Sequence, residues 1–484
     1  MMGNETLDRL LRRDRGQFLE FISIYKRTRE GATRRRKARH VAQDIARVIS
    51  AFANADGGML LVGVEEDKSV SGVDYPQPGF DTIIEAPRSL VQPALNPTAK
   101  EVVYGDKLVL KFEVAPSPVP HRFADGTYFI RTGDQDLPFP SDKIVALKEA
   151  RGRIAFEQQF VREASIEDLD EELLEEFARR TDALCDPLDL LSKTYRLIDF
   201  YNDVIRITNA VLLLFAKDPV RWNPRCGVDF IICEGTEIRP YAGPKILRRT
   251  WVEGPIFSLI PRALEVIKEQ IDRRFMRYNL FFMERFEYPP SVWQEALINA
   301  VAHRDYSLCG IPIQVWMFED RLEVRSPGLL PEPVSLEQLY RREKVHFSRN
   351  PFIVRVLTDL GYMREMGLGV SNIFHEMEKN HLQPPEFRQE GFIFSVVLRS
   401  APLFDLETQR WMERFSNYPL NVRQRRALAY ARHHGMRFTS RVYQKIGNID
   451  RDTAYREIKE MVRFGIVRPS RQRYARSYVV KDLN

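Results

Sequence analysis

The sequence predicts a multidomain protein of the α/β class. Taken as a whole, the chain is expected to be an α+β assembly of several domains. Three observations lead to this fold class. The chain has 484 residues, which is enough for about three domains. Helical patterns run directly into strand-like patterns near residues 58 and 310. Residues 421–484 combine helical patterns with a strand pair.

The first periodic element is a helix over residues 40–53, followed at once by a strand. The helix stops at the sequence Asn54–Gly58, whose two glycines allow a tight reversal, and Met59–Val64 then reads as a buried strand. The apolar residues on one face of the helix are Val41, Ile45, Val48, Ile49 and Phe52.

These strings resemble the Schlafen AlbA_2 domain, which we therefore expect over residues 1–150. The resemblance rests on several strings in the order typical of the family, namely Leu19–Phe21, Phe52–Gly58, Gly63-Val64, Gly72 and Tyr128–Gly133.

The resemblance implies a metal site, because nuclease members of the family use acidic residues to hold a divalent metal for RNA cleavage. Glu20 and Glu66 match those acids as metal ligands and catalytic residues, with Glu65 and Asp67 as alternates. Clustered carboxylates can hold Mn²⁺ or Mg²⁺, which polarises phosphate and activates water. The sequence departs from the family pattern at Ile22, where the family has a lysine. Gln17 stands where a further acid is expected.

A basic run precedes the helix at 40–53 and is a candidate phosphate contact. Such cations neutralise phosphates without reading sequence, although a solvated helix start would look the same. The candidate residues are Arg34, Arg35, Arg36 and Lys37.

Residues 151–290 are expected to form a connector domain with its own core. Ile166–Phe177 reads as an acidic helix, and Ile207–Phe215 reads as a buried element. Nothing in this segment indicates independent chemistry.

Glu295 and Asn299 lie four residues apart in an otherwise apolar helix, so they should share one face. A carboxylate can act as a general base, and a neighbouring amide oxygen can help to hold Mg²⁺ with its phosphates. The same pair could also be the solvated face of an amphipathic helix. Downstream, two strands joined by Glu319-Asp320 read as a hairpin, and Gly367 and Gly369 open another helix.

Residues 291–400 resemble the GHKL-type ATPase fold, in the divergent RecG-like branch (HATPase_c_4) that follows AlbA_2 domains. The most specific strings are Ala302–Tyr306 and Ser348–Pro351. The resemblance implies ATP and Mg²⁺ as cofactors, with Glu295 as catalytic base, Asn299 as metal ligand, and Gly367 and Gly369 at the phosphates, beneath a mobile segment around 335–350. Ser326-Pro-Gly328 stands where these ATPases carry an adenine-binding aspartate.

Residues 401–420 are expected to be a linker, and residues 421–484 resemble a winged helix-turn-helix. The third helix is capped by Asp450, and Ile466–Val480 would form the wing. Such a module puts its recognition helix into the major groove of DNA; a protein-interaction module has the same pattern. The candidate DNA contacts are Arg451, Thr453, Arg456, Lys459, Arg463, Arg471, Arg473 and Arg476.

Charge is concentrated at the two ends of the chain. Residues 1–40 carry 12 Lys and Arg against 5 Asp and Glu, and residues 421–484 carry 16 against 5. The ends are therefore +7 and +11, so the other 380 residues sum to −12 within the total of +6. This distribution is expected of nucleic-acid-facing modules around an acidic middle.

The remaining composition favours a cytoplasmic protein, because the longest apolar run is too short for a membrane span and the four cysteines lack Cys-x-x-Cys spacing. Two functions follow. The first is a DNA-binding transcriptional regulator, expected to be a homo-oligomer, whose ATP-binding domain senses a nucleotide. The second is a Schlafen-like metal-dependent nuclease acting on RNA (tRNA) or single-stranded DNA, for example in phage defence.

Overall fold

The computed structural model describes most of the chain. The described residues are 2–27, 33–140, 143–144, 147, 155–183, 185–201, 204–239, 243–278, 288–331, 334–344, 347–363, 369–380, 382–400, 406–447, 449–472 and 475–481.

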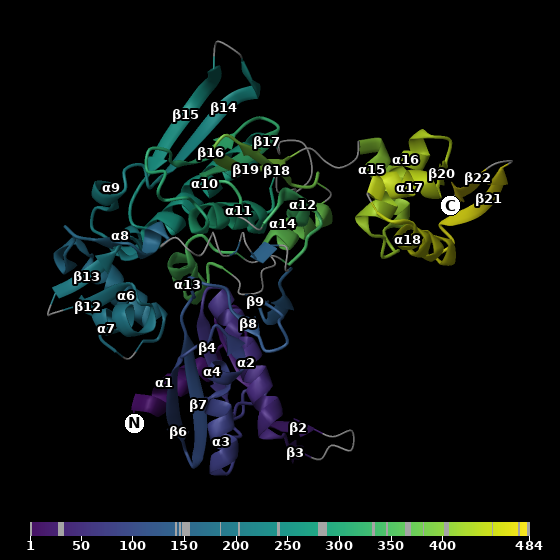
Figure 1. The fold of residues 1–484 in the computed structure, drawn as a ribbon. Helices are drawn as coiled ribbons and strands as arrows, with labels where there is room; N and C mark the ends of the chain where they lie inside the picture. The colour runs from purple at the N-terminus through teal and green to yellow at the C-terminus, as the bar shows by residue number, and fades with distance from the viewer. Residues whose placement is uncertain are drawn as a thin grey trace. The chain divides into compact units, whose positions relative to one another are not determined.

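The chain divides into two compact units (Figure 1). Unit 1 contains Met1–Glu376 and Pro385–Leu398, and unit 2 contains Met377–Pro384 and Arg399–Asn484. Within the described residues, no helix combines the length and the apolar character that crossing a membrane requires.

Unit 1 begins with a four-stranded sheet of order β1-β4-β7-β6, covered on both faces. Helix α2 packs on one face through residues such as Val41 and Phe52, and α1 packs on the other through Leu7 and Leu10. The elements are α1 (Met2–Arg12), β1 (Leu19–Ile22), β2 (Tyr25–Arg27), β3 (Thr33–Arg35), α2 (Ala38–Asn54), β4 (Gly58–Val62), α3 (Gln77–Ile84), α4 (Ala86–Ser89), β5 (Val91–Gln92), β6 (Thr98–Tyr104), β7 (Lys107–Val114), β8 (Arg122–Phe123), β9 (Phe129–Thr132) and β10 (Gln135–Pro138).

The predicted helix and buried strand are confirmed as α2 and β4, and the reversal between them depends on Gly57. Its φ of 78° lies in the left-handed region, and an added Cβ would meet the carbonyl oxygen of Val114 at 2.6 Å. The turn lets β4 run parallel to β1 and antiparallel to β7.

The segment after residue 155 forms a small three-stranded sheet with flanking helices. Helix α8 carries the apolar run that the sequence predicts to be buried, and all its residues from Ala210 to Phe215 are buried. The elements are η2 (Phe156–Gln158), β11 (Phe160–Val161), η3 (Ile166–Asp168), α6 (Glu171–Arg180), α7 (Pro187–Asp189), the π-helical η4 (Leu190–Thr194), β12 (Ile198–Tyr201), β13 (Val204–Thr208), α8 (Asn209–Phe215) and α9 (Pro219–Trp222).

The largest sheet has six strands in the order β15-β14-β16-β17-β19-β18. The predicted hairpin is confirmed, because β16 and β17 pair antiparallel with Met317 opposite Leu322. Two of the strands come from the segment assigned to the connector. The elements are β14 (Val228–Arg239), β15 (Gly243–Val252), α10 (Ile256–Tyr278), α11 (Pro290–Ala302), β16 (Ile313–Met317), β17 (Arg321–Pro327), α12 (Leu336–Tyr340), α13 (Pro351–Asp359), α14 (Gly369–Lys379), β18 (Glu386–Glu390) and β19 (Ile393–Arg399).

Unit 2 has its own core around α16, α17 and α18, with a sheet of order β20-β22-β21. The segment expected to be a linker contributes to this core, because Phe415 and Leu420 are buried in it. The elements are α15 (Leu406–Met412), η5 (Glu413–Phe415), α16 (Val422–His433), β20 (Arg437–Thr439), α17 (Ser440–Gly447), α18 (Arg451–Arg463), β21 (Val467–Gln472) and β22 (Ala475–Val480).

Candidate nucleotide and nucleic-acid sites

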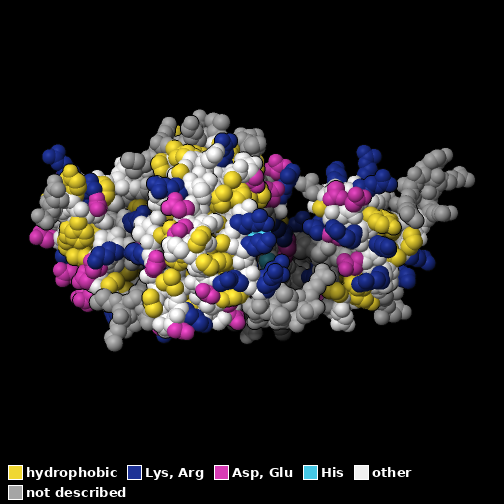
Figure 2. Space-filling model, turned by 60° about the horizontal axis from the view of Figure 1, so that its bottom comes forward, with side chains coloured by type: hydrophobic (Ala, Val, Ile, Leu, Met, Phe, Trp, Pro, Cys, Tyr) yellow, Lys and Arg dark blue, Asp and Glu magenta, His cyan; other side chains and the backbone are white. Residues whose placement is uncertain are grey.

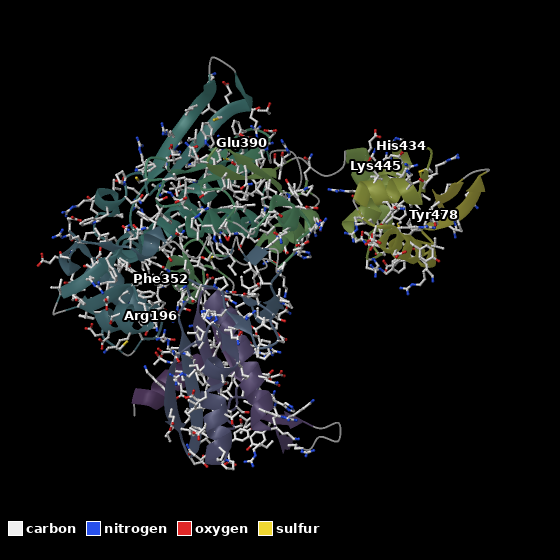
Figure 3. The ribbon with its side chains drawn as sticks, viewed as in Figure 1. Arg196, Phe352, Glu390, His434, Lys445 and Tyr478 are labelled. Atoms are coloured by element: carbon white, nitrogen blue, oxygen red, sulfur yellow. The ribbon has the colours of Figure 1, made fainter. Side chains whose placement is uncertain are left out.

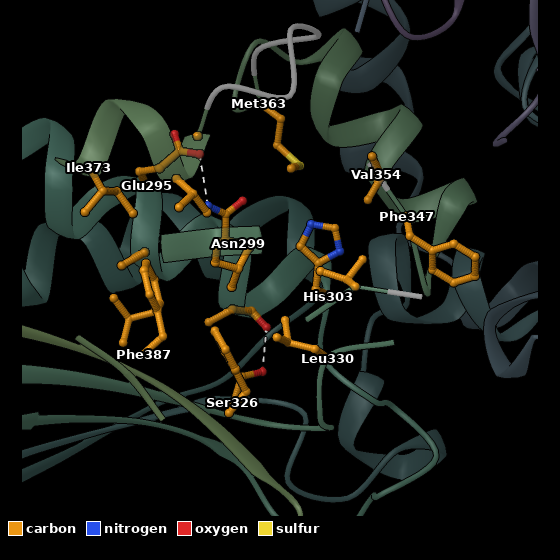
Figure 4. A pocket seen from close by; sticks show the side chains of 18 of the residues that line it. Glu295, Asn299, His303, Ser326, Leu330, Phe347, Val354, Met363, Ile373 and Phe387 are labelled. Atoms are coloured by element: carbon orange, nitrogen blue, oxygen red, sulfur yellow. Dashed lines mark hydrogen bonds between the residues drawn. The ribbon is translucent and has the colours of Figure 1, made fainter. Parts of the chain in front are cut away.

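Glu295 and Asn299 lie side by side on one face of α11. The amide Nδ2 of Asn299 donates to Oε1 of Glu295 at 2.9 Å, as one helical turn of separation allows. Figure 4 shows the amide oxygen of Asn299 turned away from Glu295. The pair therefore offers a carboxylate and an amide oxygen to the same space.

That space is a cavity of about 200 Å³, here called the central cavity. Its walls come from α11, the large sheet, and helices α12, α13 and α14, and most of the lining side chains are apolar (Figure 4). Among the described lining residues Glu295 is the one carboxylate, and none is Lys or Arg. Sites for small molecules typically measure about 300–1,000 Å³, so the described cavity is small for a whole nucleotide.

The start of α14 lies close to the Glu295–Asn299 pair. A Cβ added to Gly369 would lie 2.0 Å from Oε1 of Glu295 and 3.3 Å from Nδ2 of Asn299. A larger residue at this position would require the Glu295 carboxylate to move away. Gly367, the other predicted phosphate contact, lies outside the described residues.

Ser326 occupies the wall of the central cavity where the related ATPases carry an aspartate. Its hydroxyl donates to the carbonyl oxygen of Ala300 at 2.8 Å, so its hydrogen is already used. The site can accept a hydrogen bond from a base here, but it has no charge with which to hold one. An acceptor of this kind contributes about 1 kcal/mol when its bond is made.

The two most specific strings of this region meet at the end of α11. Nδ2 of Asn350 donates to the carbonyl oxygens of Ala302 and Arg304 at 2.9 and 2.8 Å. Arg349 donates to the carbonyl oxygens of His303 and Leu329 at 3.2 and 2.7 Å. The strings therefore hold the loop after α11 in place beside the cavity.

Two residues of the N-terminal domain also line the central cavity, and no local sequence pattern indicates this. They are Gln17 and Phe18, which precede β1. The side chain of Gln17 donates to the carbonyl oxygen of Arg131 at 3.2 Å and accepts from the backbone N–H of Gly133 at 2.8 Å. Gln17 therefore joins the cavity wall to the strand that carries Arg131.

The predicted acids of the N-terminal domain line one cleft of about 1,010 Å³, here called the N-terminal cleft. Glu66 is exposed after the end of β4, and Glu65 accepts from the hydroxyl of Ser23 at 2.6 Å. Asp67 accepts from the hydroxyl of Ser69 at 2.5 Å. The topology thus brings Glu20 and the acids after β4 around one space, because β1 and β4 are parallel neighbours.

Arginines occupy the surroundings of Glu20 where a metal was expected. Arg131, fully buried, donates to Oε2 of Glu20 at 2.8 Å and pairs with Asp136 at 3.0 Å. Alternating charges then continue along the cleft as an ion-pair ladder. The ladder runs through Arg15, Glu20, Arg131, Asp136, Arg47, Asp44 and Arg36.

The N-terminal cleft does not fit a catalytic metal. Within the part of the chain that the structure describes, no three acidic, His or Cys side chains are grouped closely enough to hold one. A guanidinium 2.8 Å from Glu20 already balances its charge and would repel a divalent cation. The string Tyr128–Gly133 contains Arg131, but its sequence alone does not show that this arginine reaches Glu20.

Two arginines of the basic run before α2 have partners within the domain. Arg36 pairs with Asp44 and donates to the carbonyl oxygen of Ser23 at 3.0 Å. Arg35 donates to the carbonyl oxygen of Asp74 at 2.6 Å. Arg34 and Lys37 are exposed beside them, so they are the members of the run best placed for phosphate.

In unit 2, helix α18 presents a cationic face. Asp450 caps the helix by accepting from the N–H groups of Asp452 and Thr453 at 2.8 and 2.9 Å. The buried side of the helix holds three apolar residues, Ala454, Ile458 and Met461. The exposed cations are Arg451, Arg456, Lys459 and Arg463, and they outnumber the exposed acids Asp452 and Glu460. Figure 2 shows Lys and Arg side chains spread over the visible face of unit 2.

Two further predicted DNA contacts, Arg471 and Arg476, lie in the hairpin β21–β22, and for these the structure describes the backbone alone. The third, Arg473, lies outside the described residues. The hairpin itself is antiparallel, with Arg471 opposite Arg476.

Comparisons with known proteins identify two domains in unit 1. Residues 17–140 match the Schlafen AlbA_2 family, and residues 310–398 match the HATPase_c_4 family, described as "Putative ATP-dependent DNA helicase recG C-terminal". The chain therefore carries a Schlafen AlbA_2 domain and a RecG-like HATPase_c_4 domain. Together they indicate a nucleic-acid-related function.

No curated protein matches the chain, whereas several solved structures do, among them two from bacteria. A crystal structure of a Corynebacterium diphtheriae protein is 19% identical with a TM-score of 0.47, covering 96% of this chain and 80% of that chain. A second similar structure, determined in solution, is that of the N-terminal domain of a Nitrosomonas europaea "Putative ATP-dependent DNA Helicase RecG-related Protein". It is 22% identical with a TM-score of 0.18, covering 24% of this chain and 72% of that chain.

Proposed function

We propose that this protein is a DNA-binding regulator that senses a nucleotide through its HATPase_c_4 domain. The observation that carries the proposal is the exposed cationic face of α18, in a segment with a net charge of +11. The order of α16, α17, α18 and the hairpin β21–β22 supports a winged helix-turn-helix, in which α18 would be the recognition helix.

The exposed cations of α18 support contact with the phosphates and base edges of a major groove. Arg456 and Lys459 lie near the middle of α18, and Arg451 lies at its start. Glu457 is turned inwards, where it accepts from the hydroxyl of Tyr443 at 2.8 Å and pairs with Arg423. The one buried acid of the helix is therefore neutralised inside, away from the DNA-facing side.

The Glu295–Asn299 pair and the close approach of Gly369 support a nucleotide-binding role for the HATPase_c_4 domain. Asn299 would hold Mg²⁺, Gly369 would let the backbone approach the phosphates, and Glu295 would be the base for any hydrolysis. ATP would supply the phosphoryl group. The serine at position 326, in place of an adenine-binding carboxylate, favours weak base selectivity.

The test of DNA binding is an affinity and salt titration. We expect the double variant Arg456→Ala/Lys459→Ala to bind labelled duplex DNA at least about tenfold more weakly, because a single base or phosphate contact contributes about 1–3 kcal/mol. The slope of affinity against salt should also fall, by about one for each phosphate that the variant no longer neutralises. Fluorescence anisotropy at several salt concentrations measures both quantities.

Arg410→Ala is the matched control for this test, because Arg410 is an exposed arginine of the same unit on α15. The control should bind like the wild type. Unchanged affinity and salt slope in the α18 double variant would overturn the DNA-binding role of that helix.

A further inference from the structure

A small cavity lies where three parts of unit 1 meet, here called the junction cavity. It measures about 60 Å³, and its walls come from β4 and β7 of the AlbA_2 domain, the turn after η4, and the start of α13. It shares no lining residue with the central cavity. Figure 3 labels Arg196 and Phe352, which both line it.

Cations outnumber anions around the junction cavity. The charged lining residues are Lys111, Lys193, Arg196, Arg355, Asp56 and Glu113. Two of the cations are satisfied nearby, because Lys111 pairs with Glu113 and Lys193 pairs with Asp189, both at 2.8 Å. The two arginines then face one remaining acid, Asp56, so the space keeps a net positive charge.

Arg196 and Arg355 come from different domains and face the same space. Arg355 lies with its guanidinium 5.1 Å from the ring centre of Tyr195. Burial lowers the pKa of Arg355, and the positive charges of Arg13 and Arg196 lower it further, against the attraction of Asp359. For Arg196, the described residues provide no hydrogen bond and no ion pair. The fold therefore holds two like charges near each other, and Arg196 has no described acid within ion-pair distance to balance it.

The backbone at Arg196 is strained. Its φ is 57°, in the left-handed region that side chains disfavour, and it closely follows the π-helical turn of η4. Backbone of this kind is unfavourable for a residue with a side chain and is concentrated at functional sites, as are π-helical turns. The strained residue lines the junction cavity.

We propose that the junction cavity binds one phosphate group, held by Arg196 and Arg355. A volume of about 60 Å³ holds about four water molecules. It therefore admits a phosphate group and excludes a nucleoside. Guanidinium groups suit such an anion, because they present paired N–H donors at the spacing of phosphate oxygens. A phosphate here would join the middle segment to α13, beside β4 and β7 of the AlbA_2 domain.

The phosphate could belong to a free ion or to a nucleic-acid backbone, and the experiment separates these sources. The thermal midpoint of the full-length protein is measured against inorganic phosphate, and separately against a short oligothymidine, with chloride keeping the ionic strength constant. A ligand that binds the folded state raises the midpoint by an amount that grows with its concentration relative to its dissociation constant. Isothermal titration gives the dissociation constants directly.

Arg196→Gly is the informative variant, because glycine removes both the cation and the strain. We expect it to be at least as stable as the wild type without ligand, yet to bind phosphate at least about tenfold more weakly. Arg225→Gly is the matched control. Arg225 is also an exposed arginine with a positive φ, 65°, and does not line the cavity. This control should keep the wild-type affinity for phosphate.

The two titrations, with inorganic phosphate and with oligothymidine, each test the proposed phosphate site. Binding of inorganic phosphate that depends on Arg196 supports a free-ion source, and Arg196-dependent binding of oligothymidine alone supports a backbone phosphate. No phosphate or oligothymidine binding by the wild type would overturn the proposal, and so would equal binding by Arg196→Gly. Neither result bears on the proposed nucleotide binding at the central cavity or on the proposed DNA binding by α18.

Discussion

At the scale of single residues, the most consequential interaction is made by a buried carboxyl group far in sequence from the helix that it caps. Glu157 accepts from the backbone N–H groups of Phe352 and Ile353 at 2.7 and 3.0 Å and so caps the start of α13. Its side chain is fully buried. Burial raises its pKa to about 8, and the nearby Asp56 raises it too, against the two backbone hydrogen bonds.

We expect this carboxyl group to make the stability of unit 1 fall as pH rises from about 5 to 8. The folded protein keeps a proton on Glu157 in this window, whereas the unfolded chain, with an ordinary value of 4.5, releases it. Deprotonation therefore favours unfolding, by about a few kcal/mol across the window. Urea unfolding at several pH values, in the wild type and in Glu157→Gln, measures the effect.

The test for Glu157 compares how steeply the free energy of unfolding depends on pH in the wild type and in the variant. The glutamine variant loses one capping bond, so its absolute stability will differ, but its stability should depend less on pH between about 5 and 8. Parallel pH profiles for the two proteins would contradict a raised pKa at this position.

Residue-scale predictions from the sequence succeeded where partners are close along the chain. Glu295 and Asn299 meet because helical spacing places them on one face. The pairing of Glu20 with Arg131 could not be predicted in this way, because 111 residues separate the two and only the packed sheet brings them together. The metal expected at Glu20 does not fit for that reason.

At the scale of elements, α11 is the helix whose function can be tested most directly. We expect Asn299→Ala to weaken binding of magnesium–ATP at least about tenfold, because the variant lacks an amide ligand. Glu295→Gln should bind the nucleotide within about threefold of the wild type and abolish any hydrolysis, because glutamine cannot act as a base. Calorimetry with magnesium–ATP and a phosphate-release assay measure the two effects.

Gln294→Ala provides the control on the same helix, since Gln294 does not line the central cavity. It should leave both measurements unchanged. If calorimetry detects no nucleotide binding by the wild type, the role of the Glu295–Asn299 pair as a nucleotide site is wrong.

Elements with a clear period were predicted best, for a physical reason. The faces of α2 and α18 follow from local apolar spacing, and Asp450 marks the start of α18 by a capping interaction with the N–H of Thr453, three residues on. The strands β14 and β15 were assigned to the connector instead. Their place in the large sheet depends on the parallel pairing of β14 with β16, in which Val228 lies opposite Ile313.

At the scale of the whole molecule, the central cavity joins the two identified domains of unit 1. Gln17 and Phe18 form part of its wall, and Gln17 bonds to the strand of Arg131. Arg131 in turn donates to the carbonyl oxygen of Gly16 and to Glu20 in the N-terminal cleft. We expect a ligand that shifts this wall to shift the ion-pair ladder as well. We further expect single-stranded nucleic acid to bind along the N-terminal cleft, so that these hydrogen bonds would couple it to the nucleotide.

We expect magnesium–ATP and single-stranded nucleic acid to change each other's affinity by the same factor, of about fivefold or more. Gln17→Ala should reduce that factor towards one, because it cuts the bonds between the wall and the Arg131 strand. Anisotropy titrations with and without nucleotide measure the factor. Gln77→Ala, an exposed glutamine on α3 of the same domain, should preserve it. A factor of one in the wild type would contradict the coupling.

The order of residues along the chain determines helix α2, strand β4, the hairpin β16–β17, the resemblance to two domain families and the placement of positive charge. These features depend on neighbours that are close in sequence. Three others required the folded chain: the arginines that neutralise Glu20, the completion of the central cavity by Gln17 and Phe18, and the meeting of Arg196 and Arg355 across the junction cavity. Each depends on segments more than 100 residues apart, which tertiary packing alone brings together.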